Sequence, residues 1–426
     1  MTVIDLGERR DTPAPADPGP RRFLRRWAPA LVVLLCLVAP TAAAPWPTQP
    51  PVATVPAGPD VQVLPFGDVL LVADGPESAA GPTPLLAAYQ LPTGRPLWRV
   101  PLPGPGRAYQ AVRVGDLVVL GVMVGAQSPS EVVGLSAADG GVRWRVEGRL
   151  HGTTPAGHLL VWGVDASGVS VLRSLDPAGG AARWSQRLAA EDVHAVRRDL
   201  RVSLLAVLAG GQLELRDPDT GAVLRGTSVP ASAGRPRVLD ATAELVLLSD
   251  GLGALTAYET ATLRRRWSLP PGPADQPDAA DCGPLICVDD GSPATRLLDP
   301  VTGETRWRSD IGPLLGPVGN RMLAVRSASG ILREHVLLDA ATGQPVRNLG
   351  RWQVASDILV LSDATFVSRR QRDGRVLVGR IDERGDGVQV LAALHGVVGV
   401  CGVFRSFVLC RREGGALGVW ELPDAR

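Results

Sequence analysis

A short motif recurs about every 40 residues along this chain, and this period restricts the possible folds more than any other feature of the sequence. The fullest copy is LLDPVTGETRW at residues 297–307, in which an acidic residue stands four positions before a glycine and a tryptophan four positions after it. The glycine position of successive copies is occupied by Gly94, Gly140, Gly180, Gly221, Leu263, Gly303 and Gly343, with degenerate copies at Asp386 and Ala425. A repeat of this length is typical of a propeller or a solenoid.

Each repeat also contains short apolar segments bounded by turn residues. Examples are LVLLSDG at 245–251, LICVDDG at 285–291 and RMLAVRS at 321–327, which are typical of β-strands. Beyond residue 44, no long segment has the 3.6-residue period of an amphipathic helix. A repeat of about 40 residues holds four strands, which is one blade, and this favours a closed propeller over a β-helix. We therefore predict an all-β propeller over residues 60–426.

The motif positions have structural roles in such a ring. The acidic side chains can accept hydrogen bonds from backbone amides of the turn; they include Asp176, Asp217, Asp299 and Asp339. Glycine tolerates a positive φ and so allows a tight hairpin. Five of the ten tryptophans share the last motif position, namely Trp98, Trp144, Trp184, Trp267 and Trp307. We expect each indole ring to cover the turn of the neighbouring blade, and the copies with Arg225, Arg347 or Val390 there to pack more loosely.

The motif resembles that of the pyrroloquinoline-quinone-type β-propeller repeat family, whose members carry A-L-D-x-x-T-G-x-x-x-W once in each blade. The resemblance covers residues 60–426. It implies a ring of four-stranded blades, for which eight is the familiar number, while nine copies of the motif leave nine blades open. We predict about eight blades. A strand near Val52–Val55 or Val61–Leu64 would complete the last blade, because the last copy reaches Arg426 without an outer strand.

The family includes quinoprotein dehydrogenases as well as a scaffold subunit of outer-membrane protein assembly and bacterial surface proteins. The dehydrogenases also use a ring formed by two adjacent cysteines, a calcium ion held by Glu and Asn, and an Asp base. Here no two cysteines are adjacent, and the two asparagines, Asn320 and Asn348, lie in no recognisable ligand pattern. We therefore predict no catalytic, cofactor-binding or metal-binding residues, no cofactor and no enzymatic activity. A diverged quinoprotein-type oxidoreductase is the alternative.

Other features of the sequence favour a binding module. The net charge is +1 and the chain contains no lysine, so nothing indicates a nucleic-acid partner. We predict a binding or scaffold propeller that meets an unknown protein or glycan through its loops, of which residues 73–84 and 268–281 are the best candidates. The five histidines have no metal-ligand spacing and are expected at the surface or in turns; they are His151, His158, His194, His335 and His395.

The amino-terminal region predicts export. Residues 1–26 form a polar tail that ends in the cationic run RRFLRR, and residues 27–44, which include Cys36, carry no charge. A helix over this apolar segment would span roughly 27 Å, close to the roughly 30 Å hydrocarbon core of a bilayer. The arginines before it place the tail in the cytoplasm and the propeller outside. We predict a single-pass signal anchor in the cell membrane and a proline-rich linker at 45–59; a cleaved signal peptide or a twin-arginine signal would give a secreted protein.

The four remaining cysteines form two close pairs, and an oxidising exterior favours their oxidation. Cys401 and Cys410 are symmetric about the dipeptide at 405–406, and Cys282 and Cys287 are symmetric about Pro284-Leu285. Two-residue turns at these dipeptides would place each pair directly opposite on a hairpin. Such positions lie about 4.5–5.5 Å apart at Cα, within disulfide range. We predict one disulfide within each pair.

Overall fold

The computed structural model describes residues 48–422 except for 59–60, 75–83, 105, 124–129, 166, 189, 199–200, 231, 233, 275, 293, 328–332, 358–364 and 383–386. The chain divides into two compact units, Met1–Pro47 and Thr48–Arg426. Every regular element of the described part is a β-strand, as the repeat predicts. No helix among these residues is long and apolar enough to cross a membrane. The segment for which a membrane helix is predicted, 27–44, lies outside the described residues.

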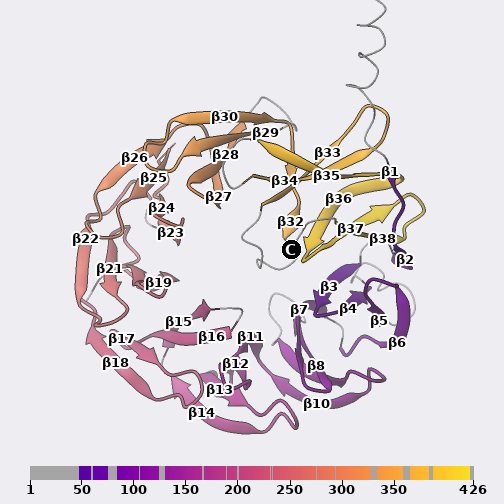
Figure 1. Ribbon diagram of the computed structural model, residues 1–426. Helices are drawn as coiled ribbons and strands as arrows, with labels where there is room; N and C mark the ends of the chain where they lie inside the picture. Colours follow the sequence, from indigo (N-terminus) through magenta and orange to yellow (C-terminus); the bar gives the residue numbers. More distant parts are fainter. Residues whose placement is uncertain are drawn as a thin grey trace, which may run out of the picture. The chain divides into compact units, whose positions relative to one another are not determined.

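The second unit is a ring of β-sheets in which the chain runs from blade to blade (Figure 1). Within a blade, the first strand lies nearest the centre of the ring and the last strand forms the outer edge. Blades 1 to 3 consist of β3 (Gln62–Phe66), β4 (Val69–Ala73), β5 (Leu85–Gln90) and β6 (Arg95–Pro101); β7 (Arg107–Val114), β8 (Leu117–Met123), β9 (Glu131–Ser136) and β10 (Val142–Glu147); and β11 (Arg149–Thr153), β12 (Leu159–Val164), β13 (Ser170–Leu175) and β14 (Ala182–Leu188).

Blades 4 to 7 repeat this antiparallel order. They consist of β15 (Ala190–Arg198), β16 (Arg201–Ala209), β17 (Gln212–Arg216) and β18 (Val223–Ser228); β19 (Arg237–Ala241), β20 (Leu245–Ser249), β21 (Leu255–Glu259) and β22 (Arg265–Leu269); β23 (Asp278–Asp281), β24 (Ile286–Asp289), β25 (Thr295–Leu298) and β26 (Thr305–Ser309); and β27 (Leu314–Val318), β28 (Arg321–Ser327), β29 (Arg333–Asp339) and β30 (Pro345–Gly350).

The last two blades take strands from both ends of the unit. Blade 8 consists of β31 (Gln353–Val354), β33 (Phe366–Arg370), β34 (Val376–Ile381) and β35 (Val388–Leu394), with β1 (Thr48–Gln49) added in parallel at its outer edge. Blade 9 consists of β36 (Val397–Phe404), β37 (Phe407–Arg412), β38 (Leu417–Glu421) and the amino-terminal strand β2 (Ala53–Val55), and the short strand β32 (Ser356–Asp357) pairs in parallel with β36.

The described strands therefore make nine blades, and the prediction of eight is wrong. Eight sheets are present, but the largest of them is two blades, 3 and 4, joined by a single parallel residue pair between Thr153 and Arg201. The ninth repeat supplies only three strands of its own. Its fourth strand comes from the other end of the unit, so the sequence of that repeat looks incomplete although its blade is not.

Strand β2 closes the ring, at the place proposed for Val52–Val55. It pairs antiparallel with β38, with Ala53 opposite Val419 and Val55 opposite Leu417. Residues 48–49 and 53–55 thus belong to the propeller, whereas the sequence predicts a linker at 45–59 and a propeller from residue 60. The prolines of this segment are compatible with strands because β1 and β2 are edge strands.

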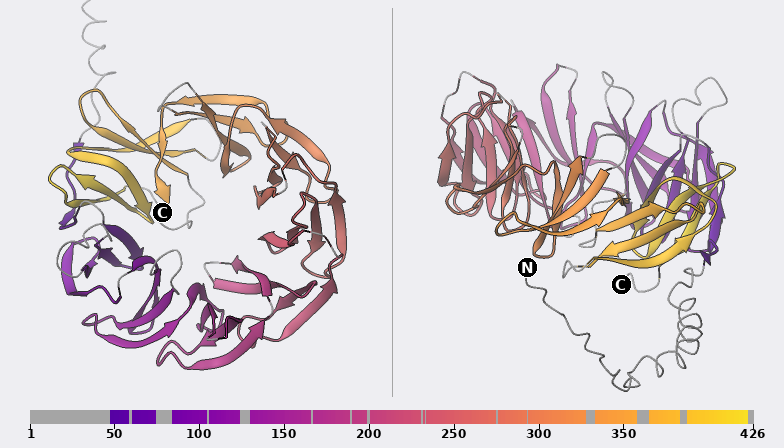
Figure 2. Two further views of the ribbon diagram at one scale, coloured as in Figure 1. Left: turned by 180° about the vertical axis from the view of Figure 1, so that it is seen from behind. Right: turned by 90° about the horizontal axis from the view of Figure 1, so that it is seen from above.

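Buried apolar residues hold neighbouring blades together. In one cluster Leu247 of blade 5 packs with Ile286 of blade 6. In another, Leu70 of blade 1 packs with Leu409 of blade 9 and with Val55 of the closing strand. Figure 2 shows this junction, where the yellow last blade lies beside the indigo first blade. The ring is therefore closed by apolar packing as well as by strand pairing.

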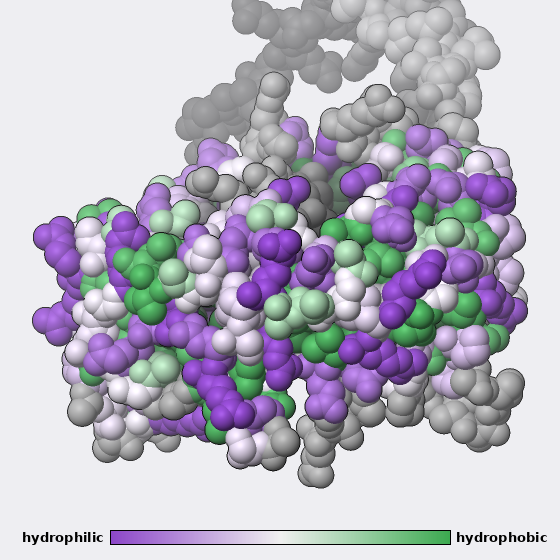
Figure 3. All heavy atoms as spheres, turned by 90° about the horizontal axis from the view of Figure 1, so that it is seen from below, coloured by the Kyte–Doolittle hydropathy of each residue, from purple (hydrophilic) through white to green (hydrophobic). Residues whose placement is uncertain are grey.

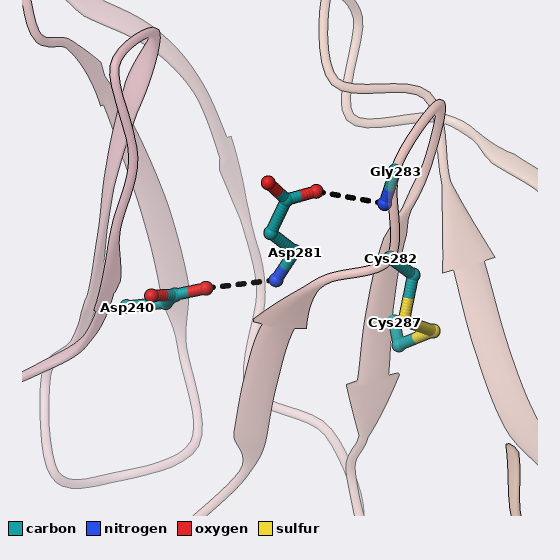
Figure 4. Close-up of a disulfide and its surroundings, with 5 residues drawn as sticks. All are labelled: Asp240, Asp281, Cys282, Gly283 and Cys287. Atoms are coloured by element: carbon teal, nitrogen blue, oxygen red, sulfur yellow. Dashed lines mark hydrogen bonds between the residues drawn. A yellow bond between two sulfur atoms is a disulfide. The ribbon is translucent and has the colours of Figure 1, made fainter. Parts of the chain in front are cut away.

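Both predicted disulfides are present. Cys401 and Cys410 are directly opposite in the β36–β37 hairpin, with a Cα–Cα distance of 4.4 Å, as predicted. Cys282 and Cys287 are also bonded, at a Cα–Cα distance of 5.7 Å, but they are not opposite (Figure 4). Cys287 is paired with Ala280, and the N–H of Cys282 donates to the carbonyl of Leu285 inside the turn. The hairpin turns one residue earlier than Pro284-Leu285, and the bond crosses it diagonally.

Candidate functional site

The acidic and glycine positions of the repeat form the turn between the third and fourth strands of a blade. In blade 6, Oδ1 of Asp299 accepts hydrogen bonds from the N–H groups of Val301 (2.7 Å) and Thr302 (3.0 Å). The N–H of Gly303, which has a φ of 74°, donates to the Asp299 carbonyl. A hydrogen bond from Arg306 lowers the pKa of Asp299 most, and the hydrogen bonds from those two amides lower it further. Equivalent turn bonds are made by Asp176, Asp217 and Asp339.

The tryptophan position connects each blade to the next one. The Nε1–H groups of four of these side chains donate to a backbone carbonyl of the following blade's turn, 2.8–3.0 Å away; the pairs are Trp98 with Ala137, Trp144 with Pro177, Trp267 with Pro300 and Trp307 with Ala340. Nε1 of Trp184 has no partner among the described residues. In each case the ring lies on the next glycine of the motif; a Cβ added at Gly303 would be 2.7 Å from Trp267. The motif residues are therefore structural.

One interface is built differently. Blade 4 has Arg225 at the tryptophan position, and this side chain is exposed. Blade 5 has Leu263 at the glycine position, and this side chain is 3% exposed among residues of both blades, although its φ is 52°. The prediction of looser packing at Arg225 is wrong because the side chain of Leu263 fills the interface from the other side.

A second set of polar residues is independent of the motif and lies on the innermost strands of blades 2 to 6. We call it the inner-strand band; it comprises Tyr109, Arg149, His151, His194, Arg197, Asp240 and Asp281. Each member contacts a residue of a neighbouring blade. The band is therefore continuous across five consecutive blades, around the centre of the ring in Figure 1.

The first half of the band is cationic. The hydroxyl of Tyr109 accepts a hydrogen bond from the N–H of Leu150 (2.6 Å), and burial raises the pKa of this tyrosine to about 12. The guanidinium carbon of Arg149 lies 5.9 Å from the centre of the same ring. From blade 4, Nη2 of Arg197 donates to the carbonyl of His151 at 2.8 Å. Burial, and then the charges of Arg149, Arg197 and His194, lower the pKa of His151 to about 4, so its imidazole is neutral near pH 7.

The second half of the band is acidic, and hydrogen bonds hold its carboxylates in place. Nε2 of His194 lies 3.4 Å from Oδ1 of Asp240, whose Oδ2 accepts the N–H of Asp281 at 2.8 Å. Oδ1 of Asp281 in turn accepts the N–H of Gly283, beside the disulfide (Figure 4). Burial raises the pKa of Asp281, helped by the charges of Asp240 and Glu244. For Asp240 burial acts in the same direction, but hydrogen bonds, first from His194 and then from Asp281, outweigh it and lower the pKa.

The structure describes only part of the two loops that we predicted as contact surfaces. Residues 75–83 of the loop at 73–84 lie outside the described residues. The other loop, 268–281, ends in the innermost strand β23, so its last four residues are part of a blade. Two histidines that we expected at the surface or in turns, His151 and His194, lie on the innermost strands β11 and β15, in the inner-strand band. Their common position on the first strand of a repeat was the one signal in the sequence that could have connected them.

Among the described residues, no group of three or more His, Cys, Asp or Glu side chains is arranged so that it could hold a metal ion. Figure 3 shows one side of the molecule, on which hydrophilic and hydrophobic residues are interspersed. The band on the inner strands is therefore the best candidate for a functional site.

The comparison with known families agrees with the turn and tryptophan geometry. Residues 82–292 match the family model described as outer membrane protein assembly factor BamB. This part of the chain is therefore similar to pyrroloquinoline-quinone-type propeller repeats. The resemblance suggested by the motif is thereby confirmed for this part of the chain. No curated protein is similar enough to match the sequence.

Solved structures with PQQ-type or other propellers resemble the chain at low sequence identity. BamB from Moraxella catarrhalis is 16% identical, with a TM-score of 0.39, and the match covers 88% of this chain and 98% of that one. A europium-containing methanol dehydrogenase is 9% identical, with a TM-score of 0.42, and covers 79% and 86%. A eukaryotic initiation factor is 12% identical, with a TM-score of 0.51, and covers 79% and 90%, which shows a shared fold.

Proposed function

We propose that this PQQ-type propeller is a non-catalytic binding or scaffold module that works outside the cytoplasm and meets a partner through its inner-strand band. The observation that carries the proposal is the continuity of the band. Seven polar or titratable residues from five blades are linked from each blade to the next by side-chain or backbone contacts, and none of them belongs to the blade motif. Polar side chains gathered on a rigid scaffold in this way are typical of binding surfaces.

The geometry of the band supports binding over catalysis. Its acids and its tyrosine hydroxyl are hydrogen-bonded to backbone N–H groups, which fixes their positions without preparing them to transfer a proton. The cysteines are bonded to partners five and nine residues away along the chain, so neither disulfide is the adjacent-cysteine ring of the quinoprotein dehydrogenases. Nothing in the described part favours the alternative of a diverged oxidoreductase.

The two disulfides support an extracytoplasmic location, because such bonds persist in oxidising compartments and are rare in the cytoplasm. The uncharged segment 27–44 supports export in the same direction, with a membrane anchor as the favoured form and a secreted protein as the alternative. We expect protease added to intact spheroplasts to degrade the propeller, and thiol mapping without reductant to recover both cysteine pairs. Protection from the protease together with four free thiols would place the propeller in the cytoplasm.

Site-specific photocrosslinking in living cells tests the binding role. A photoreactive residue at Gln110, on the inner strand β7, is compared with one at Arg308, on the outer strand β26. We expect a discrete adduct from the inner position and none from the outer position. An adduct at the outer position alone would move the interface to the rim, and no adduct at either position would contradict the proposed function.

A further inference from the structure

We propose that the cationic half of the inner-strand band is an anion site, in which Arg149 of blade 3 and Arg197 of blade 4 bind a carboxylate or phosphate group of the ligand. The inference rests on the proposed function and adds the chemical class of the group that the propeller recognises. It is carried by three observations: unpaired charges, fixed positions and a buried polar atom without a partner on the strand that carries Arg149.

The two guanidinium groups lack counter-ions. Neither has a carboxylate partner among the described residues, and both side chains are exposed. Many other arginines of the ring do have one; Arg187 lies 2.9 Å from Asp165, and Arg296 lies 2.9 Å from Asp290. Although Arg197 is exposed as a residue, its guanidinium is partly enclosed by the protein, and this burial, followed by the charge of Arg149, lowers its pKa. The two like charges therefore repel each other. An anion bound between them would remove this repulsion.

The cations are also held in place. Tyr109 of blade 2 binds the backbone of Leu150, and Arg197 of blade 4 binds the carbonyl of His151, so the short strand that carries Arg149 is fixed from both sides. Arg149 itself lies over the ring of Tyr109. A guanidinium has five N–H donors, and the bond to His151 uses one of those of Arg197. Because the donors are already positioned, little conformational entropy is lost when an anion binds.

His151 supplies the third observation. Its Nε2 atom is buried and has no hydrogen-bond partner in the described part of the chain. The centre of its ring lies 5.8 Å from that of Trp162, with the two rings tilted by 32°, and the charges of Arg149, Arg197 and His194 act on it. An imidazole that stays neutral near pH 7 adds no third positive charge to the site, and rotation of its ring would let it donate one N–H to an anion. In the acidic half of the band, by contrast, Asp240 and Asp281 would repel an anion, so the site is confined to blades 3 and 4.

The test uses the full-length chain in detergent, titrated at constant ionic strength with inorganic phosphate in one arm and with succinate in the other. Binding is followed by calorimetry and by the shift in melting temperature. We expect saturable binding of at least one probe, weakened about 10-fold or more in Arg149→Gln and in Arg197→Gln. Arg308→Gln is the matched control, because this exposed arginine lies on an outer strand, and it should bind like the parent protein. Arg149→Lys keeps the charge and should retain part of the affinity.

The two probes distinguish the source of the anion, since binding of phosphate alone indicates a phosphate-bearing ligand and binding of succinate alone a carboxylate. Arg149→Gln leaves the Arg197–His151 bond intact and removes a like charge from Arg197, so its melting temperature without anion should not fall below that of the parent. Absence of saturable binding by both probes, or equal weakening in Arg308→Gln, overturns the anion site. If photocrosslinks still form at Gln110, the binding role stands and only the anion class fails.

Discussion

The interface between blades 5 and 6 is filled by a tryptophan from the outer strand of the earlier blade, whereas the interface between blades 4 and 5 is filled by a leucine from the turn of the later blade. At the former, Trp267 lies on Gly303 of the next blade and donates to the Pro300 carbonyl at 3.0 Å. At the latter, Arg225 replaces the tryptophan and is exposed, while Leu263 replaces the glycine and is buried.

The difference shows that a missing tryptophan does not mean a loose interface. Large volume can come from the outer strand of one blade or from the turn of the next, but both together would clash, since a Cβ at Gly303 already falls 2.7 Å from Trp267. Placing leucine at position 263 costs about 1–2 kcal/mol, because its backbone φ of 52° lies in the left-handed region. Burial of an apolar side chain, worth about 1.5–3 kcal/mol, offsets it.

The largest expected effect is that of Trp267→Ala. Removing this buried ring should lower the free energy of unfolding by about 3–5 kcal/mol, as for other buried aromatic residues. Arg225 occupies the same motif position in blade 4, and Arg225→Ala should change the free energy of unfolding by less than about 0.5 kcal/mol. Urea unfolding of the disulfide-intact protein measures both. Similar losses in the two variants would show that the interfaces do not differ as described.

Leu263→Gly should have the next largest effect. The loss of a buried leucine, partly offset by relief of the positive φ, predicts a destabilisation of about 2–3 kcal/mol. Adding Arg225→Trp to this variant recreates the arrangement of the other interfaces and should recover part of the loss. A double-mutant cycle by urea unfolding measures the coupling. Strictly additive effects would contradict the idea that the two positions share one space.

Gly303→Ala tests the close approach of the indole ring. The φ of 74° alone should cost about 1–2 kcal/mol for a residue with a Cβ, and the contact with Trp267 adds to this cost. Gly374→Ala is the matched control, since its φ is 83° but no atom lies within 4 Å of an added Cβ. In thermal unfolding, the melting temperature of Gly303→Ala should be lower than that of Gly374→Ala. Equal melting temperatures would remove the steric part of the argument.

The smallest effect concerns the turn that carries Gly303. The pKa of Asp299 is lowered from 3.8, so its charged form stabilises the fold above about pH 3.8, and this stabilisation is lost as the pH falls through the lower folded-state value. Asp299→Asn should therefore be less stable than the parent near neutral pH, and the gap should narrow below about pH 3.8. Unfolding curves measured from pH 7 to pH 2.5 follow the gap. A gap that is independent of pH would exclude a role for the charge.

Much of the fold could be predicted because its signals are local. A turn of the type at Asp299–Gly303 is determined by four or five consecutive residues, and alternating apolar segments indicate strands without reference to the rest of the chain. Cys401 and Cys410 could be paired for the same reason, since a short hairpin places them opposite each other. The pairing of Cys282 with Cys287 was also predictable, but its register was not, because the position of the turn shifts by one residue.

The candidate site could not be predicted in the same way. Tyr109, Arg149, Arg197 and Asp240 are separated by tens of residues and carry no motif, and they meet because each lies on the first strand of its blade. The sequence by itself determined the repeat, the all-β class and the chemistry of the turns, since these depend on residues that are close together along the chain. Only the tertiary structure decided the ninth blade, the role of Leu263 and the inner-strand band, because each depends on side chains and strands that ring closure brings together from distant parts of the chain.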